Sequence, residues 1–73
     1  MKLTVITPQG ISYEGEVERV QLRSTNGLLE VLENHAPMIA EVKSGSIVTD
    51  REEIKCGDGV VKVLNNNIEV ICE

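Results

Sequence analysis

The single histidine, His35, is the side chain in this sequence best suited to acid–base chemistry or to activating a nucleophile. It lies in the segment Asn34-His35-Ala36-Pro37, directly after Glu33. A catalytic imidazole needs a nucleophile or an orienting carboxylate within hydrogen-bonding distance. Glu33 is a neighbour in sequence, and Cys56 or Ser24 could approach in the fold, but the pattern requires none of these contacts. We expect His35 to hold a proline-containing loop in place or to contact a partner; a small enzyme that uses His35 is the third-ranked hypothesis.

The two cysteines, Cys56 and Cys72, are the other candidate ligands or nucleophiles. They are separated by fifteen residues and form no C-x-x-C pair, so a zinc site would have too few soft ligands. The chain does not open with the charged start and apolar run of a secretory signal. We therefore expect two thiols that serve as small core residues in a reducing, cytoplasmic compartment, with a Cys56–Cys72 disulfide as the weaker alternative.

The acidic residues and the glycines give no metal or nucleotide signature. Glu14, Glu16 and Glu18 share one face of a strand by their period of two. Such a row could bind a cation weakly, but we favour a solvated face that discourages edge-to-edge aggregation. The segment Gly57-Asp58-Gly59 lacks the lysine and the following helix of a phosphate loop. No cofactor and no metal are expected.

The composition limits the class of partner. The 73 residues carry 12 acidic and 7 basic side chains, a net charge of −5, and one aromatic residue, Tyr13. Nucleic-acid binding is disfavoured, because phosphates need clustered basic side chains and bases need aromatic platforms. No run approaches the roughly 20 apolar residues that span a bilayer, so we expect a soluble chain. A single core of this size gives little net stability, and a partner surface would add to it.

Period-two alternation, interrupted by frequent turn residues, dominates the chain. Thr7-Pro8-Gln9-Gly10 and Asn26-Gly27 are strong turn signals, and no window shows the period of an amphipathic helix. Glu18-Arg19 lie out of phase between Val17 and Val20, which predicts a β-bulge or a strand that crosses between sheets. The spacing predicts an all-β fold, a small antiparallel β-sandwich of two sheets with about nine to ten short strands. The expected strands cover residues 2–5, 11–14, 17–22, 28–32, 38–43, 46–50, 51–56, 60–64 and 68–72.

Two segments of the chain resemble the epsilon subunit of F-type ATP synthases, called delta in mitochondria. The run from Thr7 to Val17, T-P-Q-G-I-S-Y-E-G-E-V, is similar to the opening hairpin of that family, and Asn34-His35-Ala36-Pro37-Met38 is similar to its central loop. Further similarity at Ser44–Ile47 and Asn67–Val70 extends the resemblance over nearly the whole chain. The N-H-A-P loop together with T-P-x-G-x-x-Y-x-G-E-V is a specific combination, whereas either motif alone is weak.

The resemblance implies a flattened sandwich of two antiparallel sheets and a non-catalytic role in the rotor of a proton- or sodium-translocating enzyme. The domain would grip the gamma subunit, rest on the c-ring and couple ion-driven rotation to ATP synthesis. It would be peripheral at the cytoplasmic face of the bacterial inner membrane, touching the membrane only through the c-ring and binding no nucleic acid and no small-molecule substrate. The gamma-facing residues would be Thr7, His35, Ala36, Pro37, Met38 and Ala40. The ring-facing residues would be Ser24, Thr25, Asn26, Gly27, Leu28 and Glu30.

Several positions depart from the family pattern. Glu30 stands where the family usually has glycine, Glu33 where it has proline, and Arg23 where it often has proline. The family also continues into a two-helix carboxy-terminal domain, so the resemblance implies that residues 1–73 form a single β-sandwich domain without it, with no ATP binding and no helical inhibitory switch. The main alternative is a generic β-sandwich adaptor, in which the N-H-A-P loop is incidental. Of Met38 and Ile39, only one can point inward by the period of two.

Overall fold

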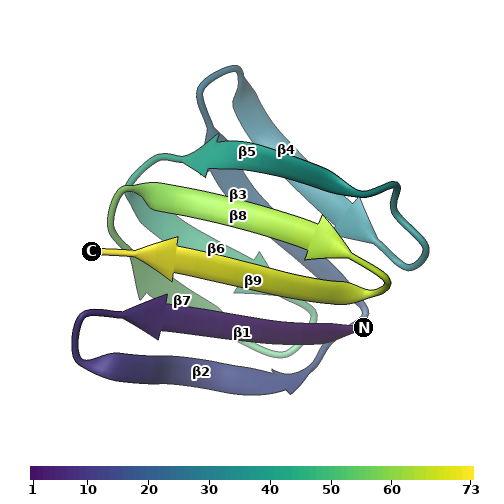
Figure 1. The fold of residues 1–73 in the computed structure, drawn as a ribbon, viewed down its shortest axis with the longest axis horizontal. Coiled ribbons are helices and arrows are strands. Elements are labelled where there is room, and N and C mark those ends of the chain that lie inside the picture. Colours follow the sequence, from purple (N-terminus) through teal and green to yellow (C-terminus); the bar gives the residue numbers. More distant parts are fainter.

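Nine strands and no helix make up the computed structural model, which describes residues 1–73. The strands form a five-stranded sheet of order β2-β1-β9-β8-β5 and a four-stranded sheet of order β4-β3-β6-β7, which face each other as two layers (Figure 1). The predicted all-β sandwich of two sheets with nine strands is confirmed. The bounds are β1 (Lys2–Thr7), β2 (Gly10–Glu16), β3 (Arg19–Ser24), β4 (Gly27–Leu32), β5 (Met38–Val42), β6 (Gly45–Thr49), β7 (Glu53–Cys56), β8 (Gly59–Leu64) and β9 (Asn67–Cys72).

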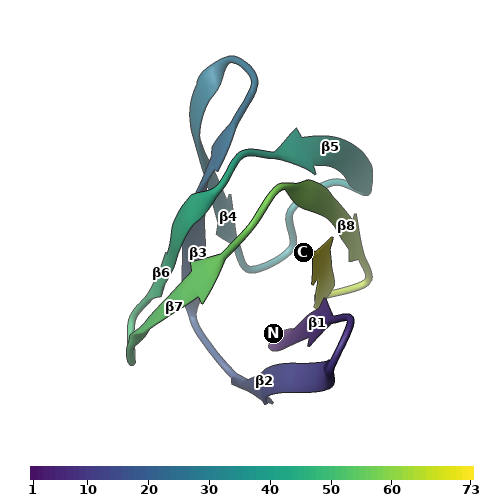
Figure 2. The ribbon, with the colours of Figure 1, turned by 90° about the vertical axis from the view of Figure 1, so that its left-hand side faces the viewer.

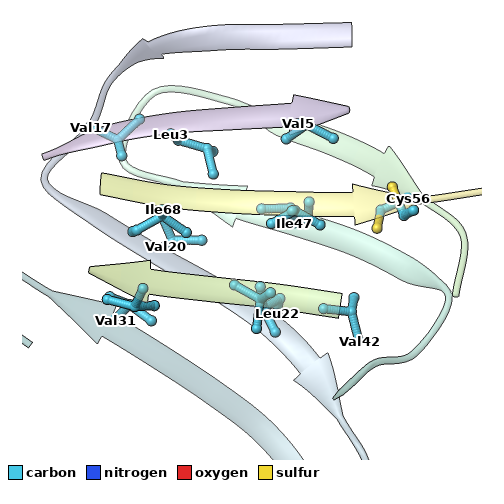
Figure 3. Close-up of a cluster of buried hydrophobic side chains, with 14 of the residues drawn as sticks. Leu3, Val5, Val17, Val20, Leu22, Val31, Val42, Ile47, Cys56 and Ile68 are labelled. Atoms are coloured by element: carbon cyan, nitrogen blue, oxygen red, sulfur yellow. The ribbon is translucent and has the colours of Figure 1, made fainter. Parts of the chain in front are cut away.

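One apolar core lies between the sheets and is built by every second residue of the central strands. Because successive side chains point to opposite faces of a strand, alternate residues of β1, β8 and β9 are buried while their neighbours face outward. Figure 3 shows the inward side chains of both sheets meeting in one cluster. Its fully buried members are Leu3, Val5, Val20, Leu22, Val31, Ile47, Val61, Ile68 and Val70.

The chain crosses from the five-stranded to the four-stranded sheet between β2 and β3, as the phase change at Glu18-Arg19 predicted. Val17 stays buried in this link, and the Glu18 amide donates a hydrogen bond to Asp50 Oδ1 at 2.8 Å. That hydrogen bond lowers the pKa of the Asp50 carboxyl, because it favours the ionised form. The link is therefore fastened to the β6–β7 turn of the second sheet.

One pairing differs from the expected antiparallel sheets. Six of the seven strand pairings are antiparallel, but β1 and β9 run parallel, with Leu3 opposite Ile68 and Val5 opposite Val70. A parallel pair needs a long crossover connection, and here the whole of β2 to β8 supplies it without a helix. We expected only antiparallel pairs because no helix was predicted that could connect parallel strands. For β1 and β9 that prediction was wrong.

Some observed strands are shorter than expected, because residues that were predicted to lie in strands form turns in the structure. The expected strands over 46–50 and 51–56 left no turn between them. In the structure Thr49 Oγ1 accepts hydrogen bonds from the Arg51 and Glu52 amides at 3.0 and 2.9 Å, so β7 begins only at Glu53. The register shift of the β1–β2 hairpin lies between Val5 and Ile6. None of the chain's segments forms a helix that could cross a membrane.

Candidate interaction surfaces at the two ends of β4

The connection between β4 and β5 contains the N-H-A-P motif and is held by side-chain amides from another loop. Asn34 has a positive φ of 63°, which asparagine tolerates better than most residues. Its amide donates to Asn66 Oδ1 at 2.7 Å, and Asn66 Nδ2 donates back to Asn34 Oδ1 at 3.2 Å. The His35 amide donates to the Leu32 carbonyl at 3.2 Å, which closes the turn after β4. The loop is thus tied to the β8–β9 turn, 32 residues away in sequence.

His35 has a local hydrogen bond and no catalytic partner in the structure. Its Nδ1–H donates to the Ala36 carbonyl at 2.7 Å, which leaves Nε2 as the free ring nitrogen. The surface hollow around it is lined by Asn34, Pro37, Asn65 and Asn66, so neither a carboxylate nor a thiol faces the ring. These contacts give His35 a part in ordering the loop, and they supply no general base or nucleophile to it.

The carboxylate of Glu33 points to the amino group of Met1 instead. Glu33 Oε1 accepts a hydrogen bond from the Met1 ammonium at 2.9 Å, and the same ammonium donates to the Val17 carbonyl at 3.2 Å. The hydrogen bond to Glu33 raises the pKa of the Met1 amino group above its usual value of 8.0. This departure from the family's proline therefore adds a tie between the loop and the start of β1.

Beyond the loop, β5 separates the predicted residues into two faces. Met38 and Ala40 are half-buried and pack against the core, whereas Ile39 points outward and is 73% exposed. Pro37, Met38 and Ile39 line a mostly apolar hollow together with Lys62, Val63 and Leu64 of β8. Ile39 is therefore the member of the pair Met38 and Ile39 that is free for a partner, whereas Leu64 was not among the predicted contact residues. The run of β8 carries valine or leucine on both faces, a pattern typical of strands that are covered on both sides, although Val60 and Leu64 are exposed in this chain.

The opposite end of β4 is a hairpin with β3 that projects beyond the body of the sandwich (Figure 2). Ser24 Oγ donates to the Gly27 carbonyl at 3.3 Å, and Gly27 has a φ of 113°, a conformation that favours glycine. Leu28 follows and is 71% exposed at the hairpin end, while Glu30 lies on the same outward face of β4. The predicted set over 24–30 is therefore contiguous and forms one projecting surface.

Thr7 does not join the other predicted gamma-facing residues. It ends β1, where its Oγ1 accepts from the Gln9 amide at 3.3 Å and donates to the Gly10 carbonyl at 3.2 Å. The residue in register with Met38 on β1 is Leu3, three strands across, and Thr7 lies four residues further along. Standard strand dimensions then place Thr7 about 20 Å from Met38. The structure brings together His35 to Ala40 and leaves Thr7 at another corner.

A second apolar feature, missed by the sequence analysis, crosses the outer face of the five-stranded sheet. The strand registers place four outward side chains in one row, namely Val60, Ile71, Ile6 and Ile11. Three of them are among the large exposed apolar side chains of the chain. The four residues lie on four different strands, so the row appears only when the pairing is known.

The comparisons with known proteins agree with this architecture. Residues 1–73 match the family described as ATP synthase, Delta/Epsilon chain, beta-sandwich domain. The chain is 34% identical to the ATP synthase epsilon chain of Clostridium novyi, over 99% of this chain and 59% of that protein. It is also 34% identical to the ATP synthase epsilon chain of Chlorobaculum tepidum, over 97% of this chain and 86% of that protein. It thus spans 59% and 86% of the lengths of these two relatives.

A solved structure shares the fold. A chain in the cryo-EM structure of the Tetrahymena thermophila mitochondrial ATP synthase, central stalk and c-ring, matches with a TM-score of 0.82. The match covers 99% of this chain and 62% of that chain at 14% sequence identity, so it shows a shared fold alone. The family match, in contrast, covers every residue of the sequence. The chain therefore belongs to the family of the β-sandwich domain of the ATP synthase delta/epsilon chain.

Proposed function

We propose that this domain is a non-catalytic central-stalk subunit of a proton- or sodium-translocating F-type ATP synthase, joining the gamma shaft to the c-ring. The observation that carries the proposal is that β4 ends in two different surfaces. One end leads into an ordered loop beside an apolar hollow, and the other is a projecting hairpin with an exposed leucine. Relatives named ATP synthase epsilon chain support the assignment of the complex.

The loop end suits a stable grip on gamma. His35, Ala36 and Pro37 lead directly into β5, and the outward Ile39 lies beside Leu64 in a hollow of mostly apolar lining. Permanent interfaces have dry apolar centres with a polar rim. Here Lys62 lines the apolar hollow, and the asparagines line a neighbouring hollow that shares Pro37 with it. Because the loop is already held by five hydrogen bonds, little conformational entropy would be lost on binding.

The hairpin end suits the polar loops of the c-ring. Ser24, Thr25 and Asn26 present short polar groups, and Leu28 gives one apolar contact. Glu30, where the family usually has glycine, adds a negative charge that would face the ring. Val31, fully buried between the two ends, anchors β4 in the core, so force at one end would be carried to the other through a packed strand.

The proposed role requires no chemistry from the domain itself. It would transmit rotation of the ring to the shaft on which ATP synthesis depends, and remain peripheral at the cytoplasmic face of a bacterial inner membrane. We further propose that residues 1–73 act as a single β-sandwich unit that binds no ATP. Calorimetry with ATP up to millimolar concentrations should show no heat of binding, and saturable binding would contradict this part of the proposal.

Co-elution from a sizing column tests the assignment. The folded chain is mixed with a cognate gamma subunit, with detergent-solubilised c-ring, and with both. We expect a stable complex with gamma and a ternary complex with both. The test variant is His35→Ala combined with Ile39→Glu, which spares the half-buried Met38 so that the core is not disturbed.

The control variant is Glu52→Lys, an exposed charge reversal in the β6–β7 turn that lies on neither surface. It should leave all complexes intact, whereas the loop variant should lose gamma. Failure of the wild-type chain to bind gamma or the ring at micromolar concentrations, with the strand signal of its circular dichroism intact, would favour the generic adaptor.

A further inference from the structure

Two buried thiols lie on facing strands of different sheets. Cys56 ends β7 in the four-stranded sheet and Cys72 ends β9 in the five-stranded sheet. Both are free and buried, with 9% and 5% of their surface exposed, and both belong to the core cluster. Figure 3 shows Cys56 at one end of this cluster.

The backbone that follows each cysteine holds the two segments against one another. The Gly57 amide donates to the Glu73 carbonyl at 3.2 Å, and the Glu73 amide donates to the Asp58 carbonyl at 3.1 Å. Gly59 has no room for a side chain, because a Cβ there would lie 2.8 Å from Cys72 Cβ. The residues directly after the two cysteines are therefore hydrogen-bonded partners, although fifteen residues separate the cysteines in the sequence.

The electrostatics of Cys56 agree with this placement. Burial, together with the neighbouring Cys72 thiol, raises the pKa of Cys56 to about 12. Its S–H group donates to the Gly57 carbonyl at 3.1 Å. The thiol form therefore predominates at neutral pH, so the pair reacts slowly with oxidants.

Both thiols border surface hollows through which a small oxidant can approach. Cys56 lines one hollow with Lys55 and Gly57, and Cys72 lines another with Asp58 and Gly59. Glu73 lines both hollows, so the two openings lie on either side of the same short segment. Burial of the sulfurs thus does not close off the pair.

We propose that Cys56 and Cys72 form a reversible intramolecular disulfide that fastens β7 to β9 and so links the two sheets covalently. In the reaction two S–H bonds break and one S–S bond forms. The two electrons and two protons pass to an oxidant of the disulfide or azo class; an azo compound takes them up as two new N–H bonds. A dithiol reductant reverses the step by thiol–disulfide exchange.

The expected consequence is a redox-dependent stability of the domain. A crosslink between residues distant in sequence restricts the unfolded chain, so the oxidised protein should melt at a higher temperature than the reduced one. The ordinary state in a reducing compartment would be the dithiol, and the disulfide would form under disulfide stress. The effect would act on the sandwich itself and does not depend on which partner it binds.

Oxidation of the folded chain by diamide at pH 8.5 tests the proposal. After oxidation the protein is unfolded in urea, alkylated with iodoacetamide and measured by mass spectrometry. We expect loss of the mass of two hydrogen atoms, no alkylation, and a tryptic peptide that joins Cys56 to Cys72. The chain is also equilibrated in mixtures of reduced glutathione and glutathione disulfide. The native chain should form its disulfide in mixtures at least about tenfold less oxidising than those that the urea-unfolded chain needs.

The single variants Cys56→Ser and Cys72→Ser are matched controls. Each keeps one thiol and replaces the other with a side chain of similar size. Each should remain alkylatable after diamide. The proposal is overturned if the folded wild-type chain keeps two alkylatable thiols under conditions that oxidise the unfolded chain, or if only disulfide-linked dimers form. These readouts use the wild-type chain, so they hold even if a serine variant fails to fold.

Discussion

The two ends of β4 differ in how their backbone is held. The hairpin end has one local side-chain bond, from Ser24 to Gly27, and one backbone bond to the rest of the chain, from the Lys43 amide to the Arg23 carbonyl, and it extends beyond the sandwich. The loop end has hydrogen bonds from Asn66, Leu32 and Met1 that reach other parts of the chain. The difference indicates a pre-ordered surface at one end and a protruding contact at the other. Two such surfaces suit a domain that binds one partner firmly at the loop end and contacts a second partner at the hairpin end.

Removing the core support common to both ends should have the largest effect. Leu22 is buried opposite Leu29 of β4, and Leu22→Ala should lower the free energy of unfolding by about 2–5 kcal/mol. For a domain of this size that is most of its stability. Leu28→Ala is the matched control, since its side chain is 71% exposed, and it should change stability by less than about 0.5 kcal/mol. Urea unfolding followed by circular dichroism measures both, and equal effects would contradict the burial.

A change at the turn glycine should disturb the hairpin end alone. Gly27 has a φ of 113°, and no atom lies within 4 Å of the position that an alanine methyl group would take, so Gly27→Ala is opposed only by backbone conformation. We expect a loss of about 1–3 kcal/mol and faster amide exchange in β3 and β4. Gly10→Ala is the control, because Gly10 has a φ of 119° and equally free space in the β1–β2 turn. It should cost a similar amount and leave amide exchange at residues 24–28 unchanged.

Removing the amide clamp should loosen the loop end. Asn66→Gly deletes both hydrogen bonds to Asn34 while tolerating the φ of 60° at this position, and should lower stability by about 1 kcal/mol. Amide exchange of Asn34 and His35 should accelerate. Asn65→Gly, at a φ of 51° and without a side-chain bond to the loop, is the control for the glycine itself. Unchanged exchange at Asn34 in Asn66→Gly would show that the clamp does not order the loop.

The smallest expected effect is the pH dependence of the Met1–Glu33 pair. The folded pKa of the Met1 ammonium is raised above 8.0 by the hydrogen bond to Glu33, so the folded state holds this proton more tightly than the unfolded state. The stabilisation is complete below pH 8 and is lost as pH rises through the raised pKa. Urea midpoints from pH 6.5 to 10.5 should therefore fall less steeply for Glu33→Gln. Parallel curves for the variant and the wild type would rule out the contribution.

The sequence predicted local features well and long-range contacts poorly, for a physical reason. Alternation and turn residues specify strands and hairpins within a few positions, so nine strands and the Asn26-Gly27 turn were predictable. The amide pair of Asn34 and Asn66 joins residues 32 apart, and the parallel pairing of β1 with β9 joins the first strand to the last. No local pattern encodes such partners. The same limit explains why the sequence could not place Thr7 relative to Met38, and why it left the pairing of Cys56 with Cys72 as the weaker alternative.

Reciprocal binding of two matched variants tests most directly the claim that each end of β4 serves a different partner. Ile39→Glu and Leu28→Glu place the same charge at apolar side chains that are 73% and 71% exposed, so neither should unfold the domain. Binding of each to gamma and to the c-ring is measured by biolayer interferometry. The account predicts that Ile39→Glu loses gamma and keeps the ring, whereas Leu28→Glu loses the ring and keeps gamma. The account is contradicted if either variant loses both gamma and the c-ring, or if both variants keep both partners.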